Sequence, residues 1–451
     1  MTEKQLATAV VAALHKRGHT AVLAGGCVRD QLLGRQPKDY DVATSATPDA
    51  VESIFPKTIA VGKQFGVVIV VEGESQIEVA TLRADGQYSD GRRPEKVQYV
   101  TSLREDAARR DFTINAMFED PLTGEILDFF GGQHDLAAGI IRAVGNPGER
   151  IEEDRLRMLR APRFASRYGF SIDPALLAAL TANAREISAV TQGRRAVSYE
   201  RIANELEGIL TSAHPLTGLD LLMQTGLLSE ILPEVVACNT AVGEQDPVWH
   251  PEGNTWVHTR MVVANLVGGS FPLMLGGLLH DVGKPKTQQR HADGRISNHE
   301  HADVGADMAR VITRRFKMSN DDSDRVVELV RMHMLMHVVD ELRKGKLVAL
   351  LGRNDIQDLI ALQHADATGT GCPDCQARSR RDFLTLKLHE LAEASKATPL
   401  VTGDTLIALG FKPGPTFKSM LTEALDAQRE GAFSTADGGR QWATQRFGVA
   451  R

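Results

Sequence analysis

Two neighbouring stretches decide the fold of the first part of the chain: Leu23-Ala24-Gly25-Gly26-Cys27-Val28-Arg29-Asp30 and Lys38-Asp39-Tyr40-Asp41-Val42. They predict a short apolar strand, a glycine turn, a helix and a second strand that carries two acids. Because side chains alternate between the faces of a strand, Asp39 and Asp41 should point the same way and lie close enough to share a divalent cation. Gly25 and Gly26 lack a Cβ, so their backbone N–H groups can approach an anion at the start of the helix.

A phosphate site beside a metal site is the arrangement that phosphoryl or nucleotidyl transfer needs. The metal neutralises the charge that develops and aligns the attacking and leaving oxygens. The alternative is an ordinary turn with solvated acids, which a lone Asp-x-Asp would favour. The Gly-Gly pair and the Arg29-Asp30 pair favour the functional interpretation instead.

The bulk composition limits the class of protein. A chain of 451 residues with 42% hydrophobic and 24% charged residues predicts two to four modules. The sequence has no apolar run of about 18 residues and no signal pattern at its N-terminus, so we expect no membrane association and a cytoplasmic location. Four cysteines are too few for a disulfide framework. Cys372 and Cys375 form half of a zinc site without a second pair, which favours a loop turn.

The formal net charge of −6 does not by itself indicate a nucleic-acid partner. The distribution of charge is more informative, because a basic groove can lie on an acidic body. Basic residues cluster at Arg92-Arg93, Arg109-Arg110, 155–167, Arg194-Arg195 and 378–381.

The rest of the first 145 residues completes a small mixed sheet. Residues 1–20 predict an amphipathic helix that packs on the sheet, and 67–71 and 77–82 predict buried strands. Glu78 on the second of these is either a third carboxylate near the metal or a solvated edge residue. Residues 83–97 are polar and glycine-rich, which predicts a mobile loop.

Two charged motifs follow. In Arg109-Arg110-Asp111, two guanidiniums and a carboxylate can bind triphosphate oxygens and a ribose hydroxyl, although a charged loop is the alternative. A helix that begins around Gly148 places Glu153, Asp154 and Arg157 on one face, where an acceptor and a donor can meet the edge of a base. The alternative there is a salt-bridged helix face. Pro162 is expected to kink or end this helix.

These motifs resemble the signature of the class II nucleotidyltransferases, the bacterial tRNA nucleotidyltransferase and poly(A) polymerase family. Arg109-Arg110-Asp111 with Phe112-Thr113-Ile114-Asn115-Ala116 resembles the family's Arg-Arg-Asp motif, and Glu153-Asp154-x-x-Arg157 its base-recognition motif. Residues 197–206 resemble its neck motif, in which Arg201 and Glu205 are expected to pair and steady the template helix. In this family a loop such as 83–94 serves the switch from adding C to adding A, which argues against an enzyme that adds only CC.

From His250 onward the order of histidines and acids resembles the HD-type metal-dependent phosphohydrolases. The resemblance implies a site for one or two transition metals, Ni²⁺, Co²⁺ or Mn²⁺. His299, His337 and His364 are close to the expected ligands, so the choices between His299 and His301 and between His333 and His337 stay open. The ligands that the resemblance implies are His258, His280, Asp281, His301, His333 and Asp366.

Together the resemblances imply an α+β protein with a polymerase-beta-like nucleotidyltransferase head and all-α neck, HD and tail domains. The expected bounds are 1–146 for the head, 147–245 for the neck, 246–375 for the HD domain and 376–451 for a tRNA-binding tail. The implied activity is template-free addition of CCA to the 3′ end of tRNA from CTP and ATP, with Mg²⁺ on Asp39 and Asp41. The implied nucleotide-binding residues are Gly25, Gly26, Arg29, Arg109, Arg110, Asp111, Glu153, Asp154 and Arg157.

Alternatives remain at this stage. An enzyme that adds only A and a poly(A) polymerase share these motifs. A hydrolase with an RNA-binding front end is a third interpretation, which the intact acids at 39 and 41 oppose. The sequence does not decide between a monomer and a homodimer.

Overall fold

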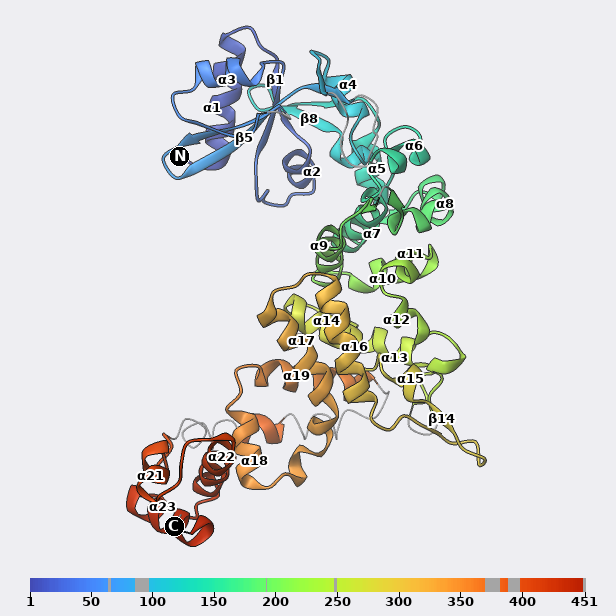
Figure 1. Cartoon of the computed structure of the whole chain (residues 1–451). Helices are drawn as coiled ribbons and strands as arrows, with labels where there is room; N and C mark the ends of the chain where they lie inside the picture. Colours follow the sequence, from blue (N-terminus) through green and yellow to red (C-terminus); the bar gives the residue numbers. More distant parts are fainter. Residues whose placement is uncertain are drawn as a thin grey trace. The chain divides into compact units, whose positions relative to one another are not determined.

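The computed structural model describes residues 1–63, 66–85, 97–191, 193–246, 250–369, 382–387 and 398–448. They form two compact units (Figure 1). The first consists of Met1–Val236 and Arg315–Lys317, and the second of Ala237–Arg314 and Met318–Arg451. Among the described residues, no helix is both long and apolar enough to span a membrane. The division into four domains remains a prediction. Cys372 and Cys375, the basic cluster 378–381 and most of the expected loop (86–96) lie outside the described residues.

The first unit is built on a seven-stranded mixed sheet with the order β3-β4-β5-β2-β1-β8-β9. β2 and β5 are parallel, and the other neighbours are antiparallel. The α+β fold expected from the sequence is confirmed. The strands are β1 (Ala21–Ala24), β2 (Asp41–Thr44), β3 (Thr58–Gly62), β4 (Val67–Glu72), β5 (Ser75–Thr81), β8 (Met117–Asp120) and β9 (Glu125–Asp128).

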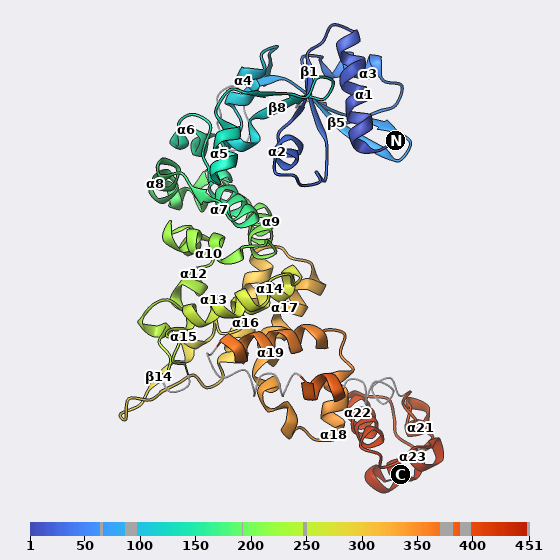
Figure 2. The same ribbon diagram turned by 180° about the vertical axis from the view of Figure 1, so that it is seen from behind.

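The predicted strand–turn–helix forms the centre of this sheet. β1 is buried at all four residues, and α2 (Gly26–Leu32) begins directly after it. Gly25 makes the turn with a φ of +70°, which side chains rarely adopt, and a Cβ there would lie 2.7 Å from Arg110 Nη1. The sequence therefore requires glycine at this turn. α1 (Glu3–Lys16) and α3 (Pro48–Ile54) pack on the sheet (Figures 1 and 2).

Helices make up most of the remainder of the first unit. They are α4 (Leu103–Ala108), η2 (Thr113–Asn115), α5 (Gly132–Ala138), α6 (Pro147–Glu153), α7 (Arg157–Tyr168), α8 (Pro174–Asn183), η3 (Ala184–Ile187), α9 (Tyr199–Leu210), α10 (Pro215–Gln224), α11 (Leu227–Ile231) and α12 (Pro233–Ala237). Short strand pairs join them: β6 (Arg83–Asp85) with β7 (Val97–Tyr99), β10 (Ile140–Ile141) with β11 (Ser171–Ile172), and β12 (Val190–Thr191) with β13 (Arg194–Arg195).

One expectation about the helix that was expected to recognise the base is wrong. The predicted helix breaks at Asp154, whose backbone is extended and whose carboxylate accepts a 3.1 Å hydrogen bond from the Leu156 N–H. Pro162 was expected to kink or end the following helix, and α7 does not end there but runs on to Tyr168. Pro162 is buried, and a Cβ on Gly218 of α10 would lie 3.3 Å from its carbonyl oxygen. Packing of α10 therefore supports the segment despite the lost hydrogen bond.

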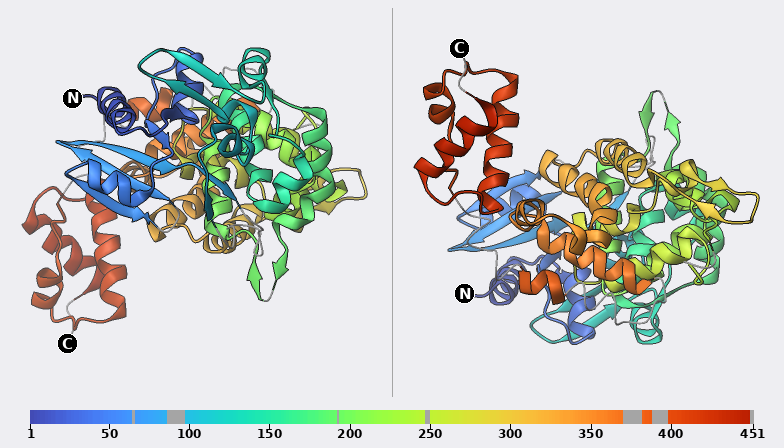
Figure 3. Two further views of the ribbon diagram at one scale, coloured as in Figure 1. Left: turned by 90° about the horizontal axis from the view of Figure 1, so that it is seen from above. Right: turned by 90° about the horizontal axis from the view of Figure 1, so that it is seen from below.

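In the part of the second unit that the structure describes, the elements are helices apart from the hairpin β14 (Gln289–Arg290) and β15 (Ile296–Ser297). This hairpin projects from its unit, as β12 and β13 project from the first unit (Figure 3). Its last three helices enclose a small core of their own that includes Leu406 and Phe433. The elements are η4 (Ala241–Gly243), α13 (Thr255–Asn265), α14 (Phe271–Leu279), α15 (Lys284–Thr287), α16 (His301–Arg315), α17 (Asn320–Met332), η5 (His333–Glu341), α18 (Lys344–Leu351), α19 (Ile356–Gly369), α21 (Gly403–Ala408), α22 (Pro415–Arg429) and α23 (Ala436–Phe447).

Candidate functional site

The first unit contains an open pocket of about 690 Å³ beside the glycine turn. Its lining includes two carboxylates from the sheet, Asp41 and Glu78, the carboxylate of Asp39 just before β2, and arginines that include several from α7. All the expected site residues of this unit line it except Glu153, which contacts a lining residue. Those that line it are Gly25, Gly26, Arg29, Asp39, Asp41, Arg109, Arg110, Asp111, Asp154 and Arg157, with Glu78 in addition.

The carboxylates meet where β2 begins. Asp41 is the first residue of β2, whereas Asp39, expected on the same strand, precedes it. Asp41 is directly opposite Glu78 in the parallel pairing of β2 with β5. Burial, followed by the charge of Glu78, raises the pKa of Asp41 to about 6, against the opposing effect of Arg110. The pKa of Asp41 stays raised despite Arg110, so these neighbouring carboxylates fit a hard divalent cation, which oxygen ligands favour.

Arg109 and Arg110 are held by an acid that the sequence analysis missed. Asp106, 1% exposed, lies 2.6 Å from Arg109 Nη2 and 3.0 Å from Arg110 Nη2. The spacings i, i+3 and i, i+4 on α4 were the signal that could have found it. Asp111 faces α7 instead, where Arg160 Nη2 lies 2.6 Å from Oδ2. Burial opposes ionisation of Asp111, but Arg160 outweighs it, and its pKa is lowered to about 2.

The residues that were expected to recognise the base lie at the junction of α6 and α7. Arg157 donates to Glu153 at 2.6 Å, and it also donates to the backbone carbonyls of Arg150 and Arg109, each at 2.8 Å. Asp154, at the end of α6, has an extended backbone and accepts two hydrogen bonds from Arg201, at 3.1 and 3.2 Å. The three residues therefore do not share one helical face as expected.

The prediction that Arg201 and Glu205 of the neck motif pair with each other is also wrong. Arg201 forms its ion pair with Asp154, and Glu205 forms one with Arg163 at 2.8 Å. Both partners come from the α6–α7 segment, so α9 supports that segment from two points.

Arg29 is buried more deeply than expected of a residue that contacts nucleotide. It is 4% exposed, donates to Asp30 at 2.9 Å and to Asn115, and its guanidinium lies 5.0 Å from the centre of the Tyr168 ring. Tyr168 in turn donates to Asp30 at 2.9 Å. Arg29 thus connects α2 to α7 at the back of the pocket.

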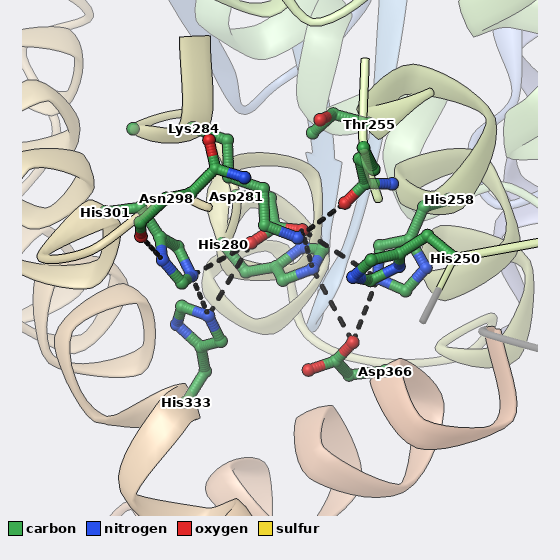
Figure 4. Close-up of polar contacts among 12 residues, drawn as sticks. His250, Thr255, His258, His280, Asp281, Lys284, Asn298, His301, His333 and Asp366 are labelled. Atoms are coloured by element: carbon green, nitrogen blue, oxygen red, sulfur yellow. Dashed lines mark hydrogen bonds and ion pairs between the residues drawn. The ribbon is translucent and has the colours of Figure 1, made fainter. Parts of the chain in front are cut away.

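The second unit holds a compact cluster of histidines and acids (Figure 4). All six residues expected from the HD resemblance are buried and lie together at the ends or first turns of five helices: α13, α14, α16, α17 and α19. They form two sets of three whose ligand atoms lie within 4.8 Å of one another. These sets are His258, His280 and Asp366, and Asp281, His301 and His333.

Asp281 faces both sets. Its Oδ2 lies 3.3 Å from His280 Nε2 and its Oδ1 lies 3.3 Å from His301 Nε2. In Figure 4, His301 and His333 lie on one side of Asp281, and His258 lies on the other. Burial opposes ionisation of Asp281, but His280 and Lys284 hold its pKa well below the usual range.

The two histidines with shifted pKa values differ in their readiness to bind a metal. Burial, together with the neighbouring His280, lowers the pKa of His333 to about 3, so this ring is neutral and can bind a metal. Burial also acts to lower the pKa of His258, but Asp366 and Glu252 on its two sides outweigh it and raise the pKa to about 9. A metal must therefore displace a proton from His258.

The burial and location of the histidines favour one candidate metal ligand in each of the two choices left open by the sequence. His299 is exposed and takes part in neither set, whereas His301 does. His337 is partly exposed and lies 2.8 Å from Asp366 Oδ2, outside both sets, whereas His333 is buried inside one. His280 Nε2 is buried and makes no hydrogen bond within the described part of the chain, so a divalent cation beside Asp281 fits the residues present.

Three family models match the chain. The model described as poly A polymerase head domain matches residues 21–142, that described as the probable RNA and SrmB-binding site of polymerase A matches 169–238, and the HD domain model matches 256–371. Nucleotidyltransferase and HD domains both imply the use of a divalent metal.

Curated relatives and solved structures agree with these matches. A CCA-adding enzyme of Lactiplantibacillus plantarum is 30% identical over 438 residues, 94% of this chain and 92% of that enzyme. A CCA-adding enzyme of Bacillus velezensis is 45% identical over 218 residues, 48% of this chain and 53% of that enzyme; in matches of this kind the chain spans about half the length of the relative. The crystal structure of the Bacillus stearothermophilus CCA-adding enzyme in complex with CTP has a TM-score of 0.69 at 28% identity and covers 99% of this chain and 98% of that one. Because it is 30% identical to the Lactiplantibacillus plantarum enzyme and this similarity covers nearly the whole of both proteins, the chain belongs to the CCA-adding enzymes, a family of nucleotidyltransferases.

Proposed function

We propose that this protein adds the terminal CCA to the 3′ end of tRNA from CTP and ATP, releasing pyrophosphate. The observation that carries the proposal is a single pocket in which Asp39 and Asp41 face arginines of the Arg-Arg-Asp motif and the Asp154–Arg157 pair. Acids for a metal, cations for phosphates and a polar pair for a base edge are the three parts that template-free nucleotidyl transfer requires. The family membership and the CTP complex of the Bacillus stearothermophilus relative support the same activity.

Each part of the pocket has a role in this mechanism. Asp39 and Asp41 would hold Mg²⁺, which would supply the positive charge that activates the terminal 3′-hydroxyl of the tRNA and offsets the charge of the triphosphate. Arg109 and Arg110, fixed by Asp106, orient their remaining donors toward the triphosphate as pyrophosphate leaves.

The incoming base is recognised without a nucleic-acid template. Asp154 offers carboxylate oxygens and Arg157 offers guanidinium donors, and both are held by hydrogen bonds that remove most of their rotamer freedom. A fixed donor–acceptor pair can select C or A by complementarity to the base edge.

The direct test replaces the acids. Asp39→Ala and Asp41→Ala should each abolish incorporation of labelled CMP into tRNA while circular dichroism shows the fold intact. Asp49→Ala is the matched control, because Asp49 belongs to the same unit but its side chain is 83% exposed and pairs with Lys63. Retention of more than a few per cent of the parent rate by either variant contradicts the metal assignment.

The nucleotides added are tested with three acceptors. tRNAs that end at the discriminator base, at C and at CC are incubated with CTP, ATP or both. We expect CC from CTP alone and one terminal A when both are present. Deleting 85–92, most of which lies outside the described residues, should spare C addition and abolish A addition. A parent enzyme that ignores CTP indicates an A-adding enzyme, and unlimited A addition indicates a poly(A) polymerase.

A second activity is proposed for the HD cluster. The two adjacent ligand sets, with Asp281 of one set 3.3 Å from His280 of the other, support a site for Ni²⁺, Co²⁺ or Mn²⁺ that hydrolyses phosphomonoesters or 2′,3′-cyclic phosphates. Asp281→Ala should abolish metal binding and hydrolysis without affecting CMP addition. Absence of bound transition metal, with no hydrolysis after metal is added, leaves the cluster a structural role.

A further inference from the structure

A third group of polar side chains adjoins the HD cluster and includes two residues, His250 and Glu252, that are not among the expected ligands. It consists of His250 and Glu252, on the loop before α13, and His258 on α13 itself. Glu252 Oε1 lies 2.9 Å from His250 Nδ1 and 3.1 Å from His258 Nδ1. The Glu252 side chain is only 3% exposed, so a carboxylate has been buried at this position beside two imidazoles.

The two nitrogens of His258 face different partners. Nδ1 faces Glu252, whereas Nε2 lies 2.9 Å from Asp366 Oδ1 and 3.9 Å from Asp281 Oδ2. The ring is 0% exposed, so no water competes for either nitrogen from bulk solvent. Glu252 is therefore behind the ring with respect to the ligand set and cannot reach an ion bound at Nε2.

A carboxylate only accepts hydrogen bonds, so the nitrogen that faces Glu252 must carry a hydrogen. Without metal, Nε2 also carries a hydrogen, directed at Asp366. When a metal displaces that hydrogen, the one N–H of the neutral ring is on Nδ1 and the lone pair of Nε2 is directed at the cluster. Carboxylate–histidine–metal arrangements of this kind fix the tautomer and the ring orientation and raise the basicity of the ligand nitrogen.

We propose that Glu252 is a positioning residue of the HD metal centre, which holds His258 as the Nδ1–H tautomer with Nε2 aimed at the metal. His250 contributes by donating to the same oxygen of Glu252 and so restricting the carboxylate. The inference rests on the proposed metal site, but it concerns a residue that is not itself a ligand.

A different role for the same group is a separate third metal site on His250, Glu252 and His258. That role would require a lone pair on His258 Nδ1 while Nε2 also binds metal, and the ring would have to lose both hydrogens. The two roles predict different metal stoichiometries, which makes them distinguishable.

The test measures Co²⁺ binding to the full chain by equilibrium dialysis and by the visible absorption of the bound ion. Glu252→Ala should weaken binding by about 10- to 100-fold at unchanged stoichiometry, the loss typical of removing such a partner. Glu252→Gln should weaken it less, because an amide oxygen still accepts the Nδ1 hydrogen. Glu244→Gln is the matched control, since this glutamate lies on the same loop region but is 53% exposed and pairs with Arg290.

The melting temperature of the metal-free protein and the rate of CMP addition should be unchanged in Glu252→Gln, which separates a positioning role from a general loss of structure. If the parent binds Co²⁺ and Glu252→Ala binds it equally tightly, the inference is wrong and the proposed metal site stands. Loss of one ion per chain at unchanged affinity for the rest also overturns it, in favour of the separate site. A parent that binds no Co²⁺ overturns the proposed metal site and the inference with it.

Discussion

Asp41→Asn should stabilise the metal-free protein at neutral pH while abolishing CMP addition. The pKa of Asp41 is raised from its ordinary value of 3.8 to about 6, first by burial and then by Glu78. Above pH 6, Asp41 is ionised in the folded protein, where burial and Glu78 disfavour its charge relative to the unfolded chain. The shift of about two units corresponds to about 3 kcal/mol of lost folding free energy at pH 7. For a unit of this size, that free energy corresponds to a rise of about 6 to 12 °C in Tm on removal of the charge.

The sign of the pH dependence follows from the same shift. Between pH 6 and 4 the folded protein takes up a proton at Asp41 that the unfolded chain does not, so the parent gains stability as the pH falls. The difference in Tm between Asp41→Asn and the parent should therefore be greatest at pH 7 to 8 and should disappear by pH 4. Mg²⁺ should raise the Tm of the parent and not that of the variant.

The assay is thermal unfolding in the presence of a chelator at intervals from pH 4 to 8, with Asp49→Asn as an exposed control whose Tm should match the parent. The reasoning is refuted if Asp41→Asn melts at or below the parent at pH 7, or if the difference does not depend on pH. Either result would mean that the three carboxylates do not repel one another in the folded protein.

Three further outcomes are expected. Arg201→Ala should lower kcat/KM for CMP addition by about 10- to 100-fold and raise misincorporation of UMP, because Asp154 loses its two hydrogen bonds; steady-state kinetics with each nucleotide measures this. Asp111→Asn should destabilise the first unit by about 2 kcal/mol at pH 7, because the lowered pKa of Asp111, about 2, makes its ionised form stabilising above pH 4. In thermal unfolding, this loss of stability should be constant from pH 5 to 8 and fall to about half by pH 3. Chelation of metal should lower the Tm of the second unit by several degrees in the parent and leave Asp281→Asn unchanged, as calorimetry with and without the chelator will show.

The glycine turn was predictable because a local rule determines it: Gly25 has to adopt a positive φ. Asp39 and Asp41 do line the same pocket, but strand alternation does not explain it, because Asp39 precedes β2. The partner strand was not predictable: that Asp41 is paired with Glu78 depends on the parallel register of β2 and β5, which strand patterns alone do not specify.

The errors lie where one residue had two structural options. Asp154 fits a helical spacing, but an aspartate also caps turns well, and its carboxylate accepts the Leu156 N–H at 3.1 Å instead. Arg201 and Glu205 are correctly spaced for a pair within α9, yet opposite charges on neighbouring elements are closer partners. Glu252 had no signal in the sequence, because its role depends on a ring six residues away whose orientation is fixed by tertiary packing.

The anchoring of Arg157 to two backbone carbonyls has a consequence for redesign of the enzyme. A carbonyl oxygen is present whatever side chain occupies the residue, so substitutions at Arg109 or Arg150 leave these two acceptors of Arg157 in place. Asp154 is held differently, because it accepts two hydrogen bonds from the side chain of Arg201. Attempts to evolve acceptance of a third nucleotide should therefore concentrate on Asp154 and Arg201, where the scaffold responds to mutation, and leave Arg157 as the invariant half of the pair.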